Sequence, residues 1–361
     1  MKDLIQILCL ILSLCVLLCS CQKPPEDVGT LDLETLRFEE YTESDFGLSI
    51  ETLIVDTQEG LLSSSYPPPQ VKPYESVWVH DKIYFLGELS SAYGLYCLDM
   101  NQDTNPLKTD IFLIADKVLT APKNVHWNDL QCAGNLLIWQ EITSDGESTS
   151  VNRLAYSPDK GMVHPPFQYG NTMYWNDTYY KFYGNPLDGT LERATPDGDY
   201  KTLITNLFFP YEETCLNDGL FAYLKGTEDR IVRFDLEQEK ALDALIIRND
   251  RPEGVQCNVS WLIGVTRIGQ VFAYSYESNQ GHFITQIDAG DWGIHGSSTK
   301  VILRGPKLWV LKEEKVEVYD LDEKAMQKLT IPESNYSNCK LDGEGQMTTC
   351  DLSADRIVII R

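Results

Sequence analysis

Short apolar and aromatic segments alternate with polar turns along most of this chain, and few segments repeat apolar residues at the helical period. Six segments share one pattern: an apolar–aromatic strand, a polar turn, and a second strand that runs into an Asp-containing turn. Asp, Asn and Gly favour such reversals because they cap the backbone and tolerate positive φ. The pattern therefore predicts successive antiparallel hairpins. Their first strands contain Ile83, Leu137, Tyr179, Leu220, Val271 and Leu308.

These hairpins recur every 37 to 54 residues, close to the roughly 40–50 residues of a four-stranded propeller blade. The spacing predicts one all-β propeller of about seven four-stranded blades, with six blades as the alternative. The best helical candidate, residues 235–245, fits a turn and an outer strand equally well. An inner strand is expected to precede each hairpin and to line a central channel. The six expected inner strands span residues 76–79, 129–132, 171–175, 212–215, 259–265 and 299–304.

The C-terminal residues 347–361 resemble the start of a last blade, with an inner strand at 347–350 and a second strand at 356–361. A propeller must close its ring, because an open sheet edge invites pairing with other chains. We therefore expect the N-terminal residues 48–65 to supply the missing outer strands. If that segment is only a packing arm, the blade count is six. A pair of β-sandwiches, or a small barrel with a second domain, fits the regular spacing less well.

The first residues form an apolar segment of about the length of a signal-peptide core, shorter than the roughly 20 residues that span a membrane. It ends in Leu18-Cys19-Ser20-Cys21, which resembles the bacterial lipobox. This resemblance implies cleavage before Cys21 and attachment of a lipid to that cysteine. An uncleaved N-terminal anchor is the alternative, and both place the body of the protein outside the cytoplasm.

These expectations divide the chain into three parts. Residues 1–20 form a lipoprotein signal peptide, residues 21–33 a lipid-attached tether, and residues 34–361 the propeller. Within the propeller, residues 34–75 supply the strands that close the ring, and residues 76–361 carry the repeated blades.

The 361-residue chain has a formal net charge of −24. Such a surface repels nucleic acid phosphates, so the expected partners are the membrane, through the lipid, and an envelope protein or a carbohydrate. Six cysteines follow Cys21 without any CxxC spacing, which gives no support for a zinc site. In an exported protein, Cys339 and Cys350 are close enough in sequence to form a disulfide.

Catalytic and metal-binding motifs are weak in this sequence. Asp99, Asn101 and Asp103 alternate as in calcium loops, but Thr104 occupies the position where a glycine is expected, so a solvated turn is the preferred interpretation. The sequence contains no HExxH, GxSxG or phosphate-loop motif. We therefore expect no metal, no cofactor and no catalytic residues.

Aromatic residues are the remaining candidates for a binding site. Trp127, Tyr174, Trp175 and Trp292 are the candidate ligand-binding residues, with His126 expected beside Trp127 at the entrance of a blade. Rings at a channel mouth can stack on sugar faces or contact a partner protein. The alternative is that these rings fill the layers between blades.

Two hairpins, "DKIYFLGELSSAYGLYCLDM" and "DGTLERATPDGDYKTL", resemble those of bacterial extracytoplasmic β-propellers related to the YWTD repeats of the low-density-lipoprotein receptor. The resemblance covers roughly residues 75–361, although no YWTD string is present and the nearest are "IYFL" and "LLIW". It implies a propeller outside the cytoplasm that acts as a binding or scaffolding module.

The sequence thus predicts a membrane-anchored lipoprotein whose propeller recognises a protein or carbohydrate ligand. One alternative is a propeller enzyme that cleaves glycans, a lyase or hydrolase, which would show two facing carboxylates with raised pKa at a channel mouth. Another is a structural envelope assembly factor.

Overall fold

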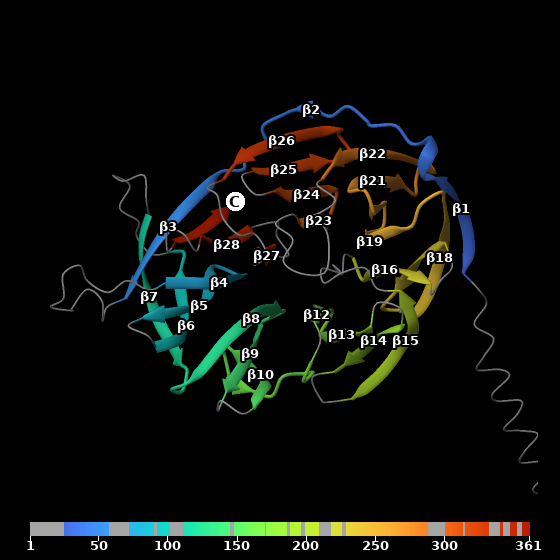
Figure 1. The fold of residues 1–361 in the computed structure, drawn as a ribbon. Helices are drawn as coiled ribbons and strands as arrows, with labels where there is room; N and C mark the ends of the chain where they lie inside the picture. The colour runs from blue at the N-terminus through green and yellow to red at the C-terminus, as the bar shows by residue number, and fades with distance from the viewer. Residues whose placement is uncertain are drawn as a thin grey trace, which may run out of the picture.

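The computed structural model shows that the chain forms a β-propeller, with its sheets arranged around a ring (Figure 1). Among the described residues, the secondary structure consists of β-strands and one short 3-10 helix, η1 (Leu33–Thr35). None of the helices formed by the described residues is long and apolar enough to cross a membrane. The structure describes residues 25–57, 72–89, 92–101, 111–144, 148–169, 171–185, 188–195, 199–208, 218–225, 229–287, 300–312, 315–331, 340–341, 347–351 and 356–361.

The described strands form five hydrogen-bonded sheets. Within them, chain order and the buried layers distinguish seven consecutive sets of strands, which we number as blades 1 to 7. Blade 1 contains β4 (Lys72–Val79), β5 (Lys82–Leu89), β6 (Ala92–Asp99) and β7 (Ile111–Thr120). Blade 2 contains β8 (Val125–Ala133), β9 (Leu136–Ser144), β10 (Thr149–Ser157) and β11 (Gly161–Val163). Blade 3 contains β12 (Asn171–Trp175), β13 (Thr178–Asn185), β14 (Asp188–Ala194) and β15 (Tyr200–Phe208).

The second half of the ring continues in the same way. Blade 4 contains β16 (Leu220–Lys225), β17 (Arg230–Asp235) and β18 (Lys240–Arg248). A short antiparallel pairing of β15 with β16 joins blade 3 to blade 4. Blade 5 contains β19 (Pro252–Cys257), β20 (Trp261–Thr266), β21 (Gln270–Ser275) and β22 (Gln280–Gln286). Blade 6 contains β23 (Lys300–Arg304), β24 (Lys307–Lys312), β25 (Lys315–Asp320) and β26 (Ala325–Thr330). Blade 7 contains β27 (Lys340–Leu341), β28 (Met347–Asp351), β29 (Arg356–Ile360) and, from the N-terminal part, β3 (Ile50–Thr57).

The hydrophobic core is divided into layers between neighbouring blades. Each of the seven buried clusters combines side chains of two adjacent blades, and one of them joins blade 7 to blade 1. In that cluster Leu53 of β3 packs with Trp78 and Ile83 of blade 1 and with Ile357 of blade 7. The aromatic and aliphatic residues of the repeats therefore pack on both sides of every described blade, which explains their regular recurrence.

The N-terminal strand β3 closes the ring, as the sequence predicts. It pairs antiparallel with β29 from Ile50 to Ile54 and parallel with β7 from Leu53 to Thr57, so it joins the last blade to the first. Two details differ from the expectation. β3 is the one described strand that residues 48–65 supply, since residues 58–65 lie outside the described part. β28 was expected to be the inner strand of the last blade, but it is the second, because β27 precedes it.

Residues 26–57 run along the outside of the ring, and we call them the belt (Figure 1). The strand β1 (Glu26–Asp32) pairs parallel with β18 of blade 4, and Phe38 forms a parallel bridge to Phe283 of β22 in blade 5. Further along, β2 (Thr42–Glu43) pairs parallel with β26 of blade 6, and β3 follows. Of residues 21–33, predicted to form a lipid-attached tether, residues 26–32 form the paired strand β1.

Side chains of the belt enter the layers between blades. Leu31, Leu33 and Leu36 are buried in the cluster between blades 4 and 5. Tyr41 packs against Tyr319 with ring centroids 5.1 Å apart, and its hydroxyl is hydrogen-bonded to Nε2 of His282 at 2.9 Å. Burial lowers the pKa of His282, which favours its neutral imidazole. The belt is thus part of the core as well as an outer strand.

Blades 2 and 3 lie outside the reach of the belt. Among the described strands, none pairs with the outer edge of β11 or with residues 200–206 of β15. β11 has only three residues, and β15 has two register shifts where it pairs with β14. Short and irregular edge strands resist pairing with other chains. The edges of blades 2 and 3 are therefore protected by their short or irregular strands, whereas the belt pairs with outer strands of other blades.

The two ends of the strands define two faces of the ring. On the turn face, tight turns join the first strand of a blade to the second and the third to the fourth, as at residues 134–135, 176–177 and 276–279. On the crossover face, the second strand turns into the third and the chain passes to the next blade, as at residues 121–124 and 249–251.

The expected inner strands agree with β4, β8, β12 and β23. In blade 5 the prediction is wrong by one strand: residues 259–265 fall on β20, which is second, and the inner strand is β19. Residues 212–215 lie outside the described part. Residues 235–245 form a turn and the start of β18, as the strand alternative predicted.

Candidate binding site on the crossover face

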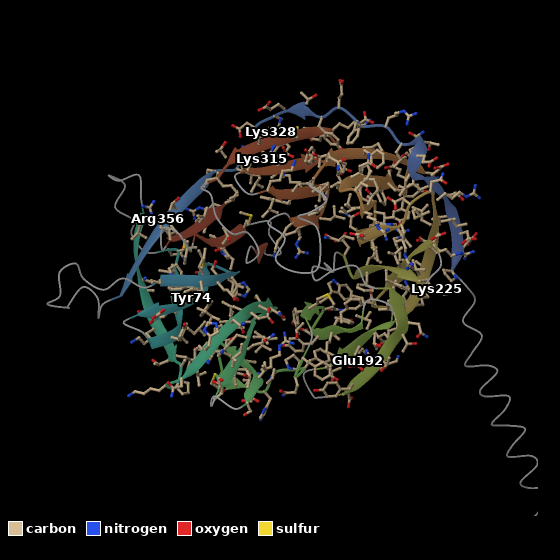
Figure 2. The ribbon with its side chains drawn as sticks, in the orientation of Figure 1. Tyr74, Glu192, Lys225, Lys315, Lys328 and Arg356 are labelled. Carbon is tan, nitrogen blue, oxygen red and sulfur yellow. The ribbon has the colours of Figure 1, made fainter. Side chains whose placement is uncertain are left out.

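Three aromatic rings from blades 1 and 2 lie in contact at the crossover face. Tyr74 is near the start of β4, Tyr93 near the start of β6, and His126 near the start of β8. The ring centroids of Tyr74 and Tyr93 are 5.8 Å apart, and those of Tyr93 and His126 are 4.9 Å apart in an edge-to-face arrangement. We call these three residues the aromatic row. Figure 2 labels Tyr74 on the inner strand of blade 1.

Local strand geometry explains how the row forms. The register between β4 and β5 shifts between Pro73 and Glu75, so Tyr74 is an extra residue in its strand. Such a bulge changes the direction of a side chain. On the next strand pair Glu88 lies directly opposite Tyr93. The bulged residue and the regular pair therefore bring Tyr74, Glu88 and Tyr93 to one end of the blade.

A carboxylate completes the row. The hydroxyl of Tyr74 donates a hydrogen bond to Oε2 of Glu88. Burial, together with the hydrogen bond to Glu88 and its charge, raises the pKa of Tyr74, so the phenol keeps its proton and acts as a donor. Tyr74, Tyr93 and Glu88 are half-buried, whereas His126 is exposed. The row thus presents ring surface together with polar groups in fixed positions, a combination that suits binding.

A network of polar side chains lies beside the row on the inner strands. Oε1 of Glu75 on β4 accepts a hydrogen bond from the backbone N–H of Asp129 at 3.1 Å, and Oε2 accepts from that of Leu130 at 2.5 Å. These donors belong to a bulge in β8, where Asp129 has a φ of 56°. Glu75 therefore stabilises the irregular backbone of the next blade.

The same network continues into blade 3. The carboxylate of Asp129 accepts hydrogen bonds from the amides of Gln131 at 2.9 Å and Gln140 at 2.8 Å. Oε1 of Gln131 accepts from Arg153 Nη2 at 2.7 Å and from the backbone N–H of Thr172 at 3.2 Å. Burial lowers the pKa of Arg153, while the charge of Asp129 opposes this shift. Together with those of Glu75, these hydrogen bonds join the inner strands of blades 1 to 3 and fix the strands that carry Tyr74 and His126.

Trp127 packs between blades 1 and 2. Its side chain is 5% exposed, its ring centroid lies 5.2 Å from that of Trp139, and its Nε1 donates to Glu141 at 3.2 Å. Its neighbour His126 faces solvent, because successive residues of a strand point to opposite sides. Trp127 therefore fills the layer between two blades, which was the alternative to ligand binding. His126 is the residue of this pair that lies at the blade entrance.

Tyr174 and Trp175 lie on the opposite, turn face. A Cβ on Gly134 would be 2.7 Å from the Tyr174 ring, and a Cβ on Gly219 would be 2.5 Å from the Trp175 ring. Both glycines have positive φ, so each ring covers a tight turn of a neighbouring blade. The Tyr174 hydroxyl donates to Asp177 at 2.6 Å, and this bond raises its pKa to about 12. These rings are half-buried and do not join the aromatic row.

The calcium-loop candidates form part of a turn. The backbone N–H of Asn101 donates to Oδ1 of Asp99 at 2.9 Å, and its side-chain amide donates to Asp81 at 2.6 Å. Within the described part of the chain, no group of three or more His, Cys, Asp or Glu side chains is placed to hold a metal ion.

Several predicted residues lie outside the described part: Cys21, Asp103, Trp292 and Cys339. Cys350 is buried in the layer between blades 7 and 1, and its disulfide with Cys339 stays a prediction. Conversely, Tyr74, Glu88 and Tyr93 are candidate site residues that the sequence did not indicate. The hairpin that places Glu88 opposite Tyr93 could have been inferred from the sequence. The bulge that places Tyr74 beside them could not.

Comparisons with known proteins give no family for this chain. No family model matches the chain, and no curated protein matches it. A solved structure of the mitotic checkpoint complex aligns at 10% identity and a TM-score of 0.48, covering 90% of this chain and 93% of that one. BamB from Moraxella catarrhalis aligns at 10% identity and 0.43, covering 81% and 83%. PorZ, a bacterial surface component of the type-IX secretion system of Porphyromonas gingivalis, aligns at 9% and 0.49, covering 78% of this chain but 36% of its own length. The TM-scores of these three alignments all lie below 0.5, so the description of the fold rests on the strand pairing of this chain itself.

The buried position of Trp127 predicts a stability effect. We expect Trp127→Ala to lower the free energy of unfolding by about 3–5 kcal/mol, because it leaves a cavity between two blades. The adjacent His126→Ala should cost about 1 kcal/mol or less, because His126 is exposed. Urea unfolding followed by circular dichroism measures both. Equal effects of the two substitutions would show that Trp127 is not a packing residue.

Proposed function

We propose that this protein is an extracytoplasmic lipoprotein whose propeller binds a protein or carbohydrate ligand at the aromatic row. The observation that carries the proposal is the contact of three rings and one carboxylate, drawn from three strands of blade 1 and one strand of blade 2, at one end of the ring. Aromatic rings with a few oriented polar groups are typical of binding sites for sugars and for protein partners.

The scaffold supports recognition in a second way. The row lies at the ends of strands whose sides pack against buried layers, including the cluster between blades 1 and 2. The Glu75 and Gln131 hydrogen bonds fix the inner strands beneath it. A ligand would therefore meet groups that are already in place, which reduces the ordering cost of binding.

The location outside the cytoplasm and the lipid anchor rest on the sequence. The lipobox-like Leu18-Cys19-Ser20-Cys21 ends five residues before β1 begins at Glu26. Lipid attached to Cys21 would thus hold the propeller at the membrane through a very short connection.

The enzyme alternative has less support from the described carboxylates. Cleavage of a glycosidic bond generally uses two carboxyl groups on either side of the bond. In the row, the hydroxyl of Tyr74 donates to Oε2 of Glu88 and so occupies that carboxylate oxygen. Glu317 is buried in blade 6. Burial would raise its pKa, but the hydrogen bond and charge of Lys312, with Tyr319 and Lys315, lower it. Glu317 is therefore a charged structural group and not a proton donor.

A binding experiment tests the row. The protein without its signal peptide is applied to a glycan array and to a panel of purified envelope proteins, and each hit is titrated. We expect Tyr93→Ala to raise the dissociation constant roughly tenfold or more, because it removes the central ring of the row. Tyr200→Ala is the matched control, since Tyr200 is 63% exposed on blade 3. Unchanged affinity in Tyr93→Ala, or no hit of either class, would contradict the proposal.

A second experiment tests the anchor independently. In bacterial cells, the wild-type protein should fractionate with membranes, and its N-terminal peptide should carry a diacylglyceryl group on Cys21. Cys21→Ser should prevent both the modification and the signal cleavage that follows it. An unmodified Cys21 in the mature wild-type protein, or an intact Met1 start, would contradict the lipoprotein assignment.

A further inference from the structure

The belt fixes the point at which the chain leaves the ring. Its first strand, β1, runs parallel to β18 on the outer edge of blade 4, and Glu26 pairs with Asp243. The strand β18 begins at Lys240 on the turn face and ends at Arg248 on the crossover face. Because the two strands are parallel, the chain enters β1 from the side of the turn face.

Chain length restricts where Cys21 can lie. Five peptide units separate Cys21 from Glu26, and a fully extended chain of that length spans at most about 18 Å. The turn-face end of β18 is three residues from Asp243, or about 10 Å, whereas the crossover end is five residues away, or about 17 Å. The connection is therefore long enough to reach past the turn face. It can only just reach the level of the crossover face, and only after reversing its direction.

We propose that the turn face of blade 4 lies against the lipid headgroups of the membrane, so that the crossover face and the aromatic row point away from it. The proposal rests on the lipid anchor at Cys21 proposed above. It explains how a propeller held by a very short connection keeps a binding site accessible to ligands outside the membrane. The relevant partner of this surface is a lipid surface.

The side chains at this end of blade 4 suit a position over headgroups. Glu237, Gln238 and Lys240 are exposed in the turn that leads into β18. Next to them Glu239 forms ion pairs with Arg193, at 2.8 Å, and with Lys201. Charged groups of this kind are costly to place in hydrocarbon. The turn face therefore rests at the membrane surface without inserting into it.

Two positions on blade 4 make a matched pair for a test. Glu237 lies in the turn between β17 and β18 on the turn face, and Asp229 lies directly before β17 on the crossover face. Both are exposed, and replacing either by cysteine removes one carboxylate. The six-residue strand β17 separates them by about 20 Å, so a quencher confined to the headgroup layer would lie at clearly different distances from the two positions.

Glu237→Cys and Asp229→Cys are produced as full lipidated proteins, labelled with a fluorophore and reconstituted in phosphatidylcholine vesicles that contain a headgroup-nitroxide lipid. The unsubstituted protein, labelled in parallel, corrects for reaction of the native cysteines. We expect quenching at position 237 to exceed that at position 229 roughly twofold or more, given the strand length between them. Equal quenching, or stronger quenching at 229, would overturn the proposed orientation.

Flotation of the vesicles separates this result from the anchor itself. Protein that does not float with vesicles contradicts the lipid anchor, and the orientation with it. Protein that floats but shows equal quenching contradicts only the orientation. Insertion of a 20-residue Gly/Ser segment between Lys23 and Pro24 provides the second variant, since a flexible linker of that length reaches about 25 Å. It should leave flotation unchanged and remove the difference between the two positions. A difference that survives the insertion would show that something other than the short connection orients the ring.

Discussion

The ring depends on the pairing of β3 with β29 and β7. These contacts join residues near the start of the chain to its last strand and to the first blade, and they bury Leu53 completely in the layer between blades 7 and 1. Six of the seven layers form between blades that follow each other in sequence, but this one requires residues about 300 positions apart to meet. Without it, two strand edges and one hydrophobic layer would be exposed at once.

The rest of the belt also covers strand edges and fills hydrophobic layers, further around the ring. From blade 4 to blade 7, its residues pair with the outer strands or bridge to them, and its leucines and Tyr41 fill the layers between. One segment therefore closes the ring, covers sheet edges and carries the connection to the proposed lipid. The aromatic row lies on blades 1 and 2, and the belt ends beside β7 of blade 1. The proposed lipid attachment and the proposed binding site therefore lie on different parts of the ring.

Local patterns were sufficient to predict the repeating part of this fold. The hairpins, the segment that closes the ring and four inner strands follow from alternation and turn residues. The strand β1 was missed because "EDVGTLD" is mostly polar and pairs along the outside of the ring. The strand β19 was missed because "PEGVQC" contains the proline and glycine that usually mark loops. The aromatic row combines residues from separate strands, one of them bulged, and such a contact exists only after folding. Trp127 was predicted to bind a ligand because large aromatic residues are common in binding sites. The sequence alone does not show that its side chain is buried between two blades.

Hydrogen–deuterium exchange of the intact protein measures the central structural claim directly. If the belt is an integral part of the ring, the amides of β1 and β3 and those of Glu39, Thr42 and Ser44, which donate to blades 5 and 6, should exchange as slowly as the outer strands to which they pair. Slow exchange confined to the blades, with belt amides fully exchanged within seconds, would contradict both the closure of the ring by β3 and the fixed point of departure on blade 4.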